Sequence, residues 1–413
     1  MVTPVFIAGV GMTPFGRHLD RSVRQLASVA IDEALDDAGC TPGQVGEIYF
    51  GNTVQGATDG QHMVRGQVAL LPLGFQGTPI FNVESACATG SSAFHLAVKA
   101  IRAGAADVVL AVAAEKMVSD DRVQMMALFD SGWDVERANE AMAEFESLAG
   151  TSLMPQSSGS KDHSIFMDIY AALARSHMHE YGTTQRQLAA IAAKNHVHSQ
   201  YNPKAQFRRP MTPEEVLSGR ALTFPLTVPM CAPISDGAAA AVLCSPAGLA
   251  SLSADSGRAV RVRASVLRSA TERGWSALDA HIGRLAALAA YEEAGLGAHE
   301  IDVVELHDAT AFSELMLTES LGLCPRGEGG VLAESGATSM GGHVPVNPSG
   351  GLECKGHPVA ATGLGQIYEL VLQLRGEAGP RQVEGARIAL QENGGGIWGY
   401  EEASTHVGIL ERN

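Results

Sequence analysis

The feature that most constrains the fold of this chain is a repeat of two short patterns, in the same order, in its two halves. Residues 34–39 read ALDDAG and residues 290–295 read AYEEAG, and each leads directly into an apolar stretch typical of a strand. Further along, the Ala-Thr-Gly of residues 88–90 returns at residues 361–363, where apolar residues again follow at helical spacing. Chance similarity is the weaker explanation, because both pairs keep their order. The chain is therefore expected to be a duplicated α/β protein.

Each repeat is expected to build the same layered unit. In the first half, a helix with one broad apolar face leads into residues 108–112, a continuous apolar run typical of a buried strand. The 413 residues are also too many for one core, since single cores rarely grow beyond about 250–300 residues. We expect residues 1–118 with 225–250 to form the N-terminal half and residues 258–413 the C-terminal half, each a mixed sheet covered by helices.

The stretch between the halves, residues 119–224, departs from this pattern and is interpreted as an insertion. It is expected to contain helices at 169–181 and 185–199 and to shape a ligand site, as long insertions on a rigid α/β core usually do. Methionines in and around it hint at an adaptable apolar pocket, although Met at helical spacing is more often core. They are Met117, Met125, Met126, Met142, Met154 and Met167.

Charge and cysteine usage exclude several classes of function. The formal net charge is −16, with 45 acidic against 29 basic residues, which argues against a nucleic-acid partner. No apolar run approaches the roughly 18 residues of a membrane span, and the N-terminus lacks the pattern of an export signal. The six cysteines include no CxxC pair, so neither a disulfide framework nor a zinc knuckle is expected. These patterns favour the reducing cytoplasm, with no membrane span and no bound metal.

Residues 194–209 form the one obvious basic stretch, and they include Lys194 and Arg208. An anionic ligand needs such a local basic patch in a chain that is acidic overall. A solvated helix end explains these charges about as well.

Cys87 is the leading candidate nucleophile. It lies in residues 82–92 (NVESACATGSS), after an expected strand and at the start of an expected helix. The partial positive charge of a helix N-terminus favours thiolate over thiol, and the small flanking residues leave room for a bulky substrate. A free cysteine is more often an inert buried residue, but this position and these neighbours favour a reactive one.

Two histidines lie in segments that suit a partner role. His357 lies near the end of a Gly- and Pro-rich loop, residues 347–358, so the repeat brings it toward the same face as Cys87. It can polarise a thioester carbonyl or take the thiol proton. His307 lies where an expected strand ends, which is where α/β folds bind ligands, and it can donate to a carbonyl oxygen or hold a water. Asp308 beside it is interpreted as the cap of the next helix.

A run of three glycines, residues 394–396, follows an expected strand at 386–390. Glycines at such a place let backbone N–H groups turn toward a ligand oxygen, and Gly394 is therefore a candidate for an oxyanion hole. A plain tight turn is the alternative.

Together these four segments resemble the thiolase family, and specifically its sterol-carrier-protein-type branch, across essentially the whole chain. The resemblance implies the thiolase fold: two duplicated βαβαβαββ halves in five layers, α-β-α-β-α, with an inserted lid domain. It implies that Cys87 is acylated, that His357 activates it and that His307 helps to bind the thioester oxygen. It also implies an oxyanion hole of His307 and His357, and a second one of backbone N–H groups at Cys87 and around Gly394.

The resemblance extends to ligands and partners. Residues 231–239 and the insertion look like those of the family, in which the insertion covers coenzyme A, so Ser235, Lys194 and Arg208 are the predicted coenzyme A contacts. Coenzyme A enters as a substrate, and no cofactor is expected. The resemblance implies a homodimer, and members that look like this often work with a small partner that carries an OB-fold and a zinc ribbon.

Two positions depart from the family pattern. Ordinary thiolases carry an acid/base cysteine two residues before the glycine run, where this chain has Glu392. The sterol-carrier-type branch keeps a cysteine inside the segment that matches residues 307–310, where this chain has Ala309. Cys354, three residues before His357, and Glu392 are the predicted substitutes, because a thiol or a desolvated carboxylate can move a proton there.

The leading hypothesis is a degradative thiolase, an acyl-CoA C-acyltransferase that cleaves a 3-oxoacyl-CoA with coenzyme A through an acyl-enzyme on Cys87. A carbon–carbon lyase of the retro-aldol type, or a C-acyltransferase that needs the zinc-ribbon partner, is the second hypothesis, because both acid/base cysteines are missing. A non-catalytic acyl-CoA-binding subunit is the third, and the retained Cys87 and histidines argue against it.

Overall fold

The computed structural model describes residues 2–149, 163–253 and 255–413. One nine-stranded mixed sheet extends through the molecule in the order β3-β2-β4-β7-β1-β8-β11-β10-β9, and a small second sheet pairs β5 with β6. The strands are Val5–Met12 (β1), Glu47–Gly51 (β2), Ile80–Val83 (β3), Val108–Glu115 (β4), Ala221–Thr223 (β5), Leu226–Thr227 (β6), Gly237–Cys244 (β7), Val260–Ser269 (β8), Val303–Glu305 (β9), Ile388–Gly395 (β10) and Ser404–Arg412 (β11).

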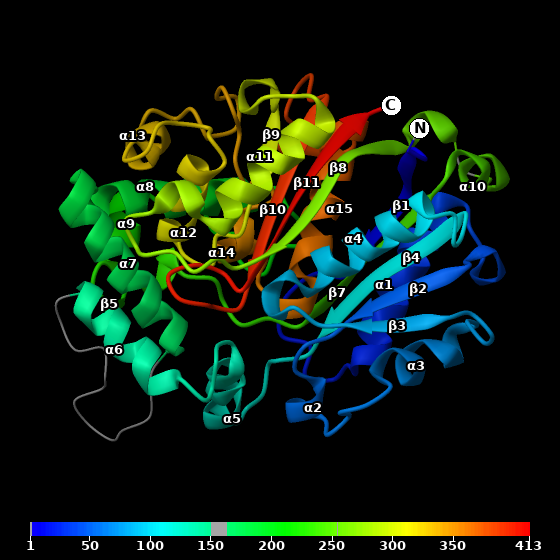
Figure 1. The fold of residues 1–413 in the computed structure, drawn as a ribbon, viewed down its shortest axis with the longest axis horizontal. Helices are drawn as coiled ribbons and strands as arrows, with labels where there is room; N and C mark the ends of the chain where they lie inside the picture. Colours follow the sequence, from blue (N-terminus) through cyan, green and yellow to red (C-terminus); the bar gives the residue numbers. More distant parts are fainter. Residues whose placement is uncertain (1, 150–162, 254) are drawn as a thin grey trace.

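Helices cover both faces of the large sheet and build the insertion (Figure 1). The first half contains Val23–Ala38 (α1), Gln55–Thr58 (α2), Arg65–Leu70 (α3), Thr89–Arg102 (α4) and Pro246–Ser251 (α10). The insertion contains Arg122–Ala127 (α5), Ala138–Ala149 (α6), Ile165–Tyr181 (α7), Gln185–Ser199 (α8) and Pro213–Leu217 (α9). The second half contains Ile282–Ala294 (α11), Ala311–Ser320 (α12), Gly329–Glu334 (α13), Gly351–Lys355 (α14) and Thr362–Arg375 (α15). None of the helices described here has the length and apolar character needed to cross a membrane.

The duplication seen in the sequence is present in the sheet. In the first half β2 pairs with β4 in parallel and β4 pairs with β7 antiparallel, and β9, β10 and β11 repeat this pattern in the second half. The halves join where β1 and β8 pair antiparallel. β3 lies parallel to β2, whereas its counterpart in the second half is reduced to one bridge between Val304 and Val346. The two halves share one topology, and the second is shorter by one strand.

Buried apolar side chains separate five layers, which confirms the predicted fold class. α1 packs on the outer face of β1 and β7, and α11 packs on the outer face of β8 and β11. α4 and α15 lie together between the two half-sheets, where Phe94, Ile101, Ile367 and Leu370 join the central core. The order is helix, sheet, helix, sheet, helix, and the β1–β8 pairing joins the two sheet layers edge to edge.

The repeated Ala-Thr-Gly turns meet each other at the starts of α4 and α15. A Cβ atom at Gly90 would lie 2.6 Å from the carbonyl oxygen of Ala360, and one at Gly363 would overlap Oγ of Ser91. Both positions are far inside van der Waals contact, so only glycine fits there. The repeated glycine is thus a packing requirement, and it brings the start of α4 directly against the second half.

The insertion packs mainly on the second half. α8 contacts α12, α13 and α14, and α7 contacts α12, so their apolar side chains share one cluster with Phe312, Leu315 and Met316. Figure 1 shows α6, α7 and α8 grouped beside α12 and away from α1 and β1. The predicted helix at 185–199 is confirmed as α8, and the one at 169–181 is confirmed as α7, which begins earlier, at Ile165.

Candidate active site

Cys87 lies between β3 and α4, in the single turn Ala86–Ala88. Ala86 has a φ of 47°, in the left-handed region that residues with a side chain rarely adopt. The turn is held because the Thr89 hydroxyl donates to the Ala86 carbonyl and the Glu84 carboxylate accepts from the Ala86 N–H. Such backbone strain is common at functional sites, and here it fits a turn that holds the Cys87 side chain in one position.

The Cys87 thiol is neutral at rest. Burial raises its pKa to about 12, and the carboxylates of Glu115 and Glu84 act in the same direction. Hydrogen bonds from the backbone N–H groups of Gly396 and of Cys87 itself oppose this shift. The prediction that the helix N-terminus favours the thiolate does not hold, because desolvation outweighs the partial charge of the helix. The thiol therefore needs a base.

His357 is oriented as that base. It lies in the loop between α14 and α15, where its backbone N–H donates to the Ser235 hydroxyl at 2.9 Å. The Thr362 hydroxyl donates to the Pro358 carbonyl, so it accepts from Nδ1–H of His357, 2.7 Å away. This assignment leaves Nε2 of His357 without a proton. Burial lowers the pKa of His357 to about 4, so the ring is neutral at neutral pH.

His307 has the opposite tautomer. It follows β9, and its Nδ1 accepts a hydrogen bond from the side-chain amide of Asn393 at 2.8 Å. The Ser91 hydroxyl donates to Oδ1 of Asn393, which fixes the orientation of that amide. Nε2 of His307 therefore carries the proton and can donate to a substrate oxygen. Burial, with a smaller effect of His357, lowers the pKa of His307 well below its usual value, so this ring is also neutral.

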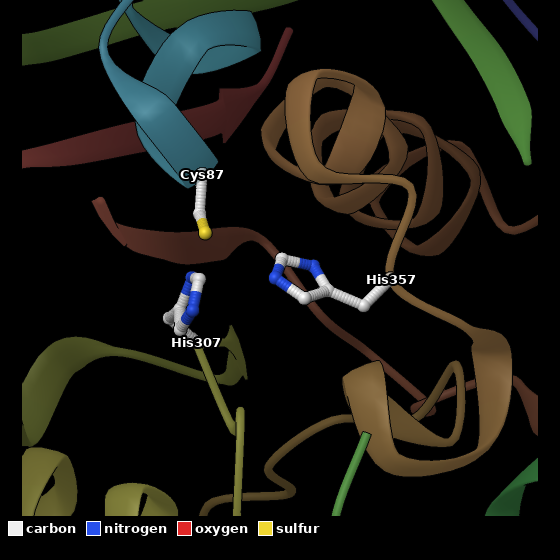
Figure 2. A group of neighbouring side chains, drawn as sticks. All are labelled: Cys87, His307 and His357. Carbon is white, nitrogen blue, oxygen red and sulfur yellow. The ribbon is translucent and has the colours of Figure 1, made fainter. Parts of the chain in front are cut away.

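The structure brings Cys87, His307 and His357 together from three separate parts of the chain. The Cys87 sulfur and one ring nitrogen of each histidine all lie within 4.8 Å of one another. The two rings are 5.2 Å apart between centroids and nearly perpendicular. In Figure 2 the sulfur points toward the space between the two rings. A thiol, an accepting nitrogen and a donating N–H at one point are the groups that acyl transfer through a cysteine needs.

The same three side chains are the one set, within the described ranges, whose donor atoms are grouped closely enough to suggest a metal site. Zinc takes sulfur and imidazole nitrogen as ligands and needs a lone pair from each. His307 has no lone pair to offer, because Asn393 donates to its Nδ1 and its Nε2 carries the proton. The hydrogen bonds therefore suit acid–base chemistry better than metal binding.

β10 closes the site beside Cys87. The strand was predicted to end before the glycine run, but it extends through Gly394 and Gly395. A Cβ atom at Gly395 would lie 2.9 Å from the backbone nitrogen of Cys87 and would overlap the carbonyl oxygen of Ser85. The missing side chain thus lets β10 lie directly against the Cys87 turn. In the glycine run, the N–H group that reaches the sulfur is that of Gly396.

A cavity of about 290 Å³ opens above these groups. Cys87, His307 and His357 lie at one end, and the wall from the insertion is mainly apolar and aromatic, with His163, Ser164 and Arg220 as its polar members. That wall includes Met126, Phe129, Phe166, Met167, Tyr170 and Leu222. Two of the predicted pocket methionines therefore line the cavity, while Met154 lies outside the described residues.

Cys354 and Glu392, the two predicted proton carriers, are fully buried and are not among the described residues that line the cavity. The Cys354 side chain lies in α14 beside the Ser199 hydroxyl, and burial raises its pKa well above the usual value. Oε2 of Glu392 accepts from the backbone N–H of His307 at 3.1 Å, and its Oε1 has no hydrogen-bond partner. Cys354 thus points away from the cavity, and Glu392 lies behind His307.

The predicted coenzyme A contacts also lie outside the cavity. Lys194 is buried, and its ammonium group pairs with Glu314. Ser235 is buried and accepts the backbone N–H of His357. These two polar groups already have structural partners, whereas Arg208 is exposed and stays a prediction.

Asp308 caps a different helix from the one expected. Thr310 is the N-cap of α12, which follows in the chain. The Asp308 carboxylate instead accepts from the backbone N–H groups of Leu352 and Glu353 in α14. Sequence proximity misled the prediction, because the carboxylate reaches a helix start that is distant in the chain.

Two buried residues that line the cavity were missed from the sequence, Tyr170 in α7 and Glu402 before β11. The available signal for Glu402 was an acidic pair, Glu401 and Glu402, just before a largely buried strand. Arg273 pairs with Glu401, and only Glu402 faces the cavity. A sequence does not show which of two adjacent carboxylates has a cation as its partner.

Known proteins match the chain over nearly its whole length. Residues 5–223 match the thiolase N-terminal domain, and residues 273–411 match the thiolase C-terminal domain-like family. Acetyl-CoA acetyltransferase of Methanothermobacter thermautotrophicus is 37% identical over 98% of this chain and 98% of its own. Sterol carrier protein 2 of Bos taurus is 39% identical over 94% of this chain and 69% of its own. Benzoylsuccinyl-CoA thiolase subunit BbsB of Thauera aromatica is 36% identical over 95% of this chain and 94% of its own.

Solved structures share the fold. The Ltp2-ChsH2(DUF35) aldolase has a TM-score of 0.77 at 23% identity, over 99% of this chain and 98% of that chain. Human mitochondrial 3-ketoacyl-CoA thiolase in complex with CoA has a TM-score of 0.69 at 18% identity, over the same shares of the two chains. Identities this low show the fold alone, but the two domain matches and the curated relatives go further. This chain belongs to the thiolase family, within its sterol-carrier-protein-type branch, and is an acyltransferase.

Proposed function

We propose that this chain is a degradative thiolase that cleaves a 3-oxoacyl-CoA with coenzyme A through an acyl-enzyme on Cys87. The observation that carries the proposal is the meeting of a neutral thiol, an unprotonated His357 nitrogen and a His307 N–H at one end of an apolar cavity. These groups supply the nucleophile, the base and the oxyanion donor of acyl transfer through a cysteine.

In the first half-reaction Nε2 of His357 takes the thiol proton while Cys87 adds to the 3-keto carbon. The two events are coupled, because burial disfavours a free thiolate. In this proposal Nε2–H of His307 and the backbone N–H of Gly396 stabilise the negative oxygen. The bond between C2 and C3 then breaks, and the acyl-CoA carbanion that leaves must be protonated. Coenzyme A takes the acyl group from Cys87 in the second half-reaction.

The acyl group that fits best is apolar and contains an aromatic ring. Phe129 and Phe166 meet edge to face with centroids 6.2 Å apart, and Trp133 stacks on Phe166 with centroids 5.9 Å apart. Trp133 lies behind the lining and supports Phe166, and a wall of two phenylalanine rings favours planar rings, which bury much apolar area at fixed geometry. The 36% identical relative from Thauera aromatica is named for benzoylsuccinyl-CoA, which supports this choice.

The test is turnover of a series of aliphatic and aryl 3-oxoacyl-CoAs with coenzyme A, followed by mass spectrometry of the products and of the intact protein. We expect an acyl adduct on Cys87 and faster cleavage of the aryl substrates. Cys231→Ala is the matched control, because Cys231 lines the same cavity but does not belong to the group formed by Cys87, His307 and His357. A Cys87→Ala variant that cleaves as fast as the wild type would sink the proposal.

A second candidate is a carbon–carbon lyase of the retro-aldol type. The observation that favours it is the presence of Ala309 and Glu392 where thiolases have their acid/base cysteines. An aldol cleavage forms no acyl-enzyme, so intact-protein mass separates the two. Cleavage of a 3-hydroxyacyl-CoA without any adduct on Cys87 would favour the lyase.

We further propose a cytoplasmic homodimer that works with a small partner subunit. The Thauera relative is named as a subunit, and the aldolase with the same fold is named for two components. Purification of the tagged chain from its own cells tests the partner, since the proposal requires a second, smaller polypeptide in the complex. Arg208 is retained as a proposed coenzyme A contact, and it is tested by the KM for coenzyme A in Arg208→Ala.

A further inference from the structure

We propose that Glu402 is the catalytic residue that gives a proton to the α-carbon, in place of the cysteine that this chain lacks. The inference rests on the proposed function and names a group that the function requires. Ala309, the position where the branch carries its cysteine, lines the cavity, so the usual place is present but holds no acid. Glu402 is the only acidic side chain among the described residues that line this cavity.

Gly394 opens the path from Glu402 to the cavity. Side chains alternate along a strand, so Glu392 and Gly394 face the same side of β10. A Cβ atom at Gly394 would overlap Cγ of Glu402. The Glu402 side chain therefore occupies the space that a side chain at position 394 would fill. Glu392 remains behind, where its Oε2 is held by the backbone N–H of His307.

The Glu402 carboxyl group has an unused hydrogen-bonding position. Its Oε2 is buried without a partner, and it faces Nε2 of His281, also without a partner, at 3.6 Å. That separation is too long for a hydrogen bond. Nδ1 of His281 accepts from the backbone N–H of Gly283, so the single proton of this neutral ring is on Nε2.

Oε2 of Glu402 and Nε2 of His281 face each other without a hydrogen bond. This arrangement is expected if the Glu402 carboxyl group holds a proton at rest. Burial raises the pKa of Glu402, and the neighbouring Glu401 acts in the same direction. A carboxyl group in this state can act as an acid, as buried catalytic carboxyl groups do. When it loses the proton, a small shift brings Nε2–H of His281 onto the carboxylate, which stabilises the charge only in that state.

Over one turnover, His357 and Glu402 each return to their starting protonation state. His357 takes the thiol proton as the bond from Cys87 to the 3-keto carbon forms. The bond between C2 and C3 breaks, its electron pair stays on C2, and the Glu402 carboxyl proton goes to C2. The coenzyme A thiol then gives its proton to the Glu402 carboxylate and attacks the thioester. The Cys87 sulfur leaves as a thiolate and takes its proton back from His357.

The test compares two readouts in Glu402→Gln. The first is acylation of Cys87 by p-nitrophenyl acetate, whose leaving group departs without a proton, measured by intact-protein mass. The second is exchange of the α-hydrogens of acetyl-CoA with deuterium oxide, measured by NMR. We expect acylation within about threefold of the wild type and exchange reduced at least about 100-fold, the usual contribution of a general acid–base group. Retained acylation also shows that the variant folds.

Glu392→Gln is the matched control, because it removes another ionisable group that lies near the cavity but does not line it. It is expected to keep exchange within about tenfold, well short of the loss that a general acid–base group causes. Exchange by Glu402→Gln at the wild-type rate would overturn the assignment, and so would loss of exchange in the control alone. A wild type that is never acylated on Cys87 would overturn the proposed function, so the two failures are distinguishable.

Discussion

At the residue scale, the two histidines of the site, His307 and His357, have opposite hydrogen-bonding roles. Thr362 accepts from Nδ1–H of His357, whereas Asn393 donates to Nδ1 of His307. One ring therefore presents a lone pair to the site and the other presents an N–H. The roles of base and oxyanion donor follow from these neighbours and not from the histidines themselves.

Replacing Thr362 by Val tests this division. The substitution removes the acceptor and leaves Nδ1–H of His357 unpaired in a buried site, at a cost of about 1–3 kcal/mol. We expect kcat to fall about 10- to 100-fold, with little change in KM, because the base and not the substrate contact is affected. Thr362→Ser keeps the hydroxyl and is expected to stay within about threefold of the wild type, as a surviving hydrogen bond predicts. Equal activity of both variants in steady-state kinetics would show that this hydroxyl does not control the tautomer.

The alkylation rate of Cys87 is a second residue-scale prediction. Because burial raises its pKa to about 12, the thiolate fraction increases about tenfold for each pH unit between roughly pH 6 and 9. Iodoacetamide labelling, followed by intact-protein mass, is therefore expected to rise across this range without a plateau. Cys87→Ala identifies the labelled site. A plateau below pH 8 would instead indicate a thiolate–imidazolium pair at rest.

Residues in the repeated motifs could be found from the sequence, and residues that depend on distant contacts could not. Cys87 and His357 each precede one of the two Ala-Thr-Gly turns, and those turns pack together in the structure. Cys354 was predicted because it is close to His357 in the chain, but α14 turns it inward, toward Ser199. Glu402, which precedes β11, has room beside the cavity only because Gly394 in β10 lacks a side chain.

At the scale of elements, the approach of β10 to the Cys87 turn depends on Gly395. A methyl group there would overlap the carbonyl oxygen of Ser85, a backbone atom that cannot rotate away. We expect Gly395→Ala to displace the turn, with loss of most Cys87 acylation and about 1–3 kcal/mol of stability, as overpacking of a tight contact costs. Gly43→Ala is the control, because a Cβ atom there meets nothing within 4 Å. Cys87 acylation and urea unfolding are measured on both variants. Equal acylation and equal stability of Gly395→Ala and Gly43→Ala would contradict the prediction.

Element types were easier to predict than element ends. The helix at 185–199 has apolar residues at helical spacing and a capping Thr184, and its observed bounds agree with the prediction. The predicted end of β10 was wrong, because the prediction assumed that the glycine run stops the strand. Pairing overrides that preference, since Gly394 and Gly395 stay in register with Thr405 and Ser404 of β11.

At the scale of the whole molecule, the site exists only where the two halves meet. The first half supplies Cys87, and the second supplies both histidines. The buried carboxylate of Glu115 joins the halves behind the site, because it accepts from the backbone N–H groups of Thr53 and Val54 and from that of Ala360. Duplication thus places a nucleophile and its base at two facing helix starts.

Buried histidines should make the whole protein lose stability in acid. Burial lowers the pKa of His95 and His357 to about 4 and that of His198 to about 3. Histidine in an unfolded chain titrates at about pH 6.5. Between about pH 4 and 6.5 the unfolded chain therefore binds protons that the folded protein does not, and the free energy of unfolding falls as the pH falls.

Buried carboxyl groups act in the opposite direction. Burial raises the pKa of Glu115 to about 7 and shifts that of Glu402 upward as well. Glutamate in an unfolded chain titrates at about pH 4.3. Between about pH 4.3 and 7 the folded protein keeps protons that the unfolded chain has lost. The free energy of unfolding therefore falls as the pH rises through this range. Urea unfolding is therefore expected to give a maximum near about pH 6, with lower values at about pH 4.5 and 8. A free energy of unfolding that rises steadily from pH 5 to 8 would mean that these buried carboxyl groups ionise in the folded protein without cost.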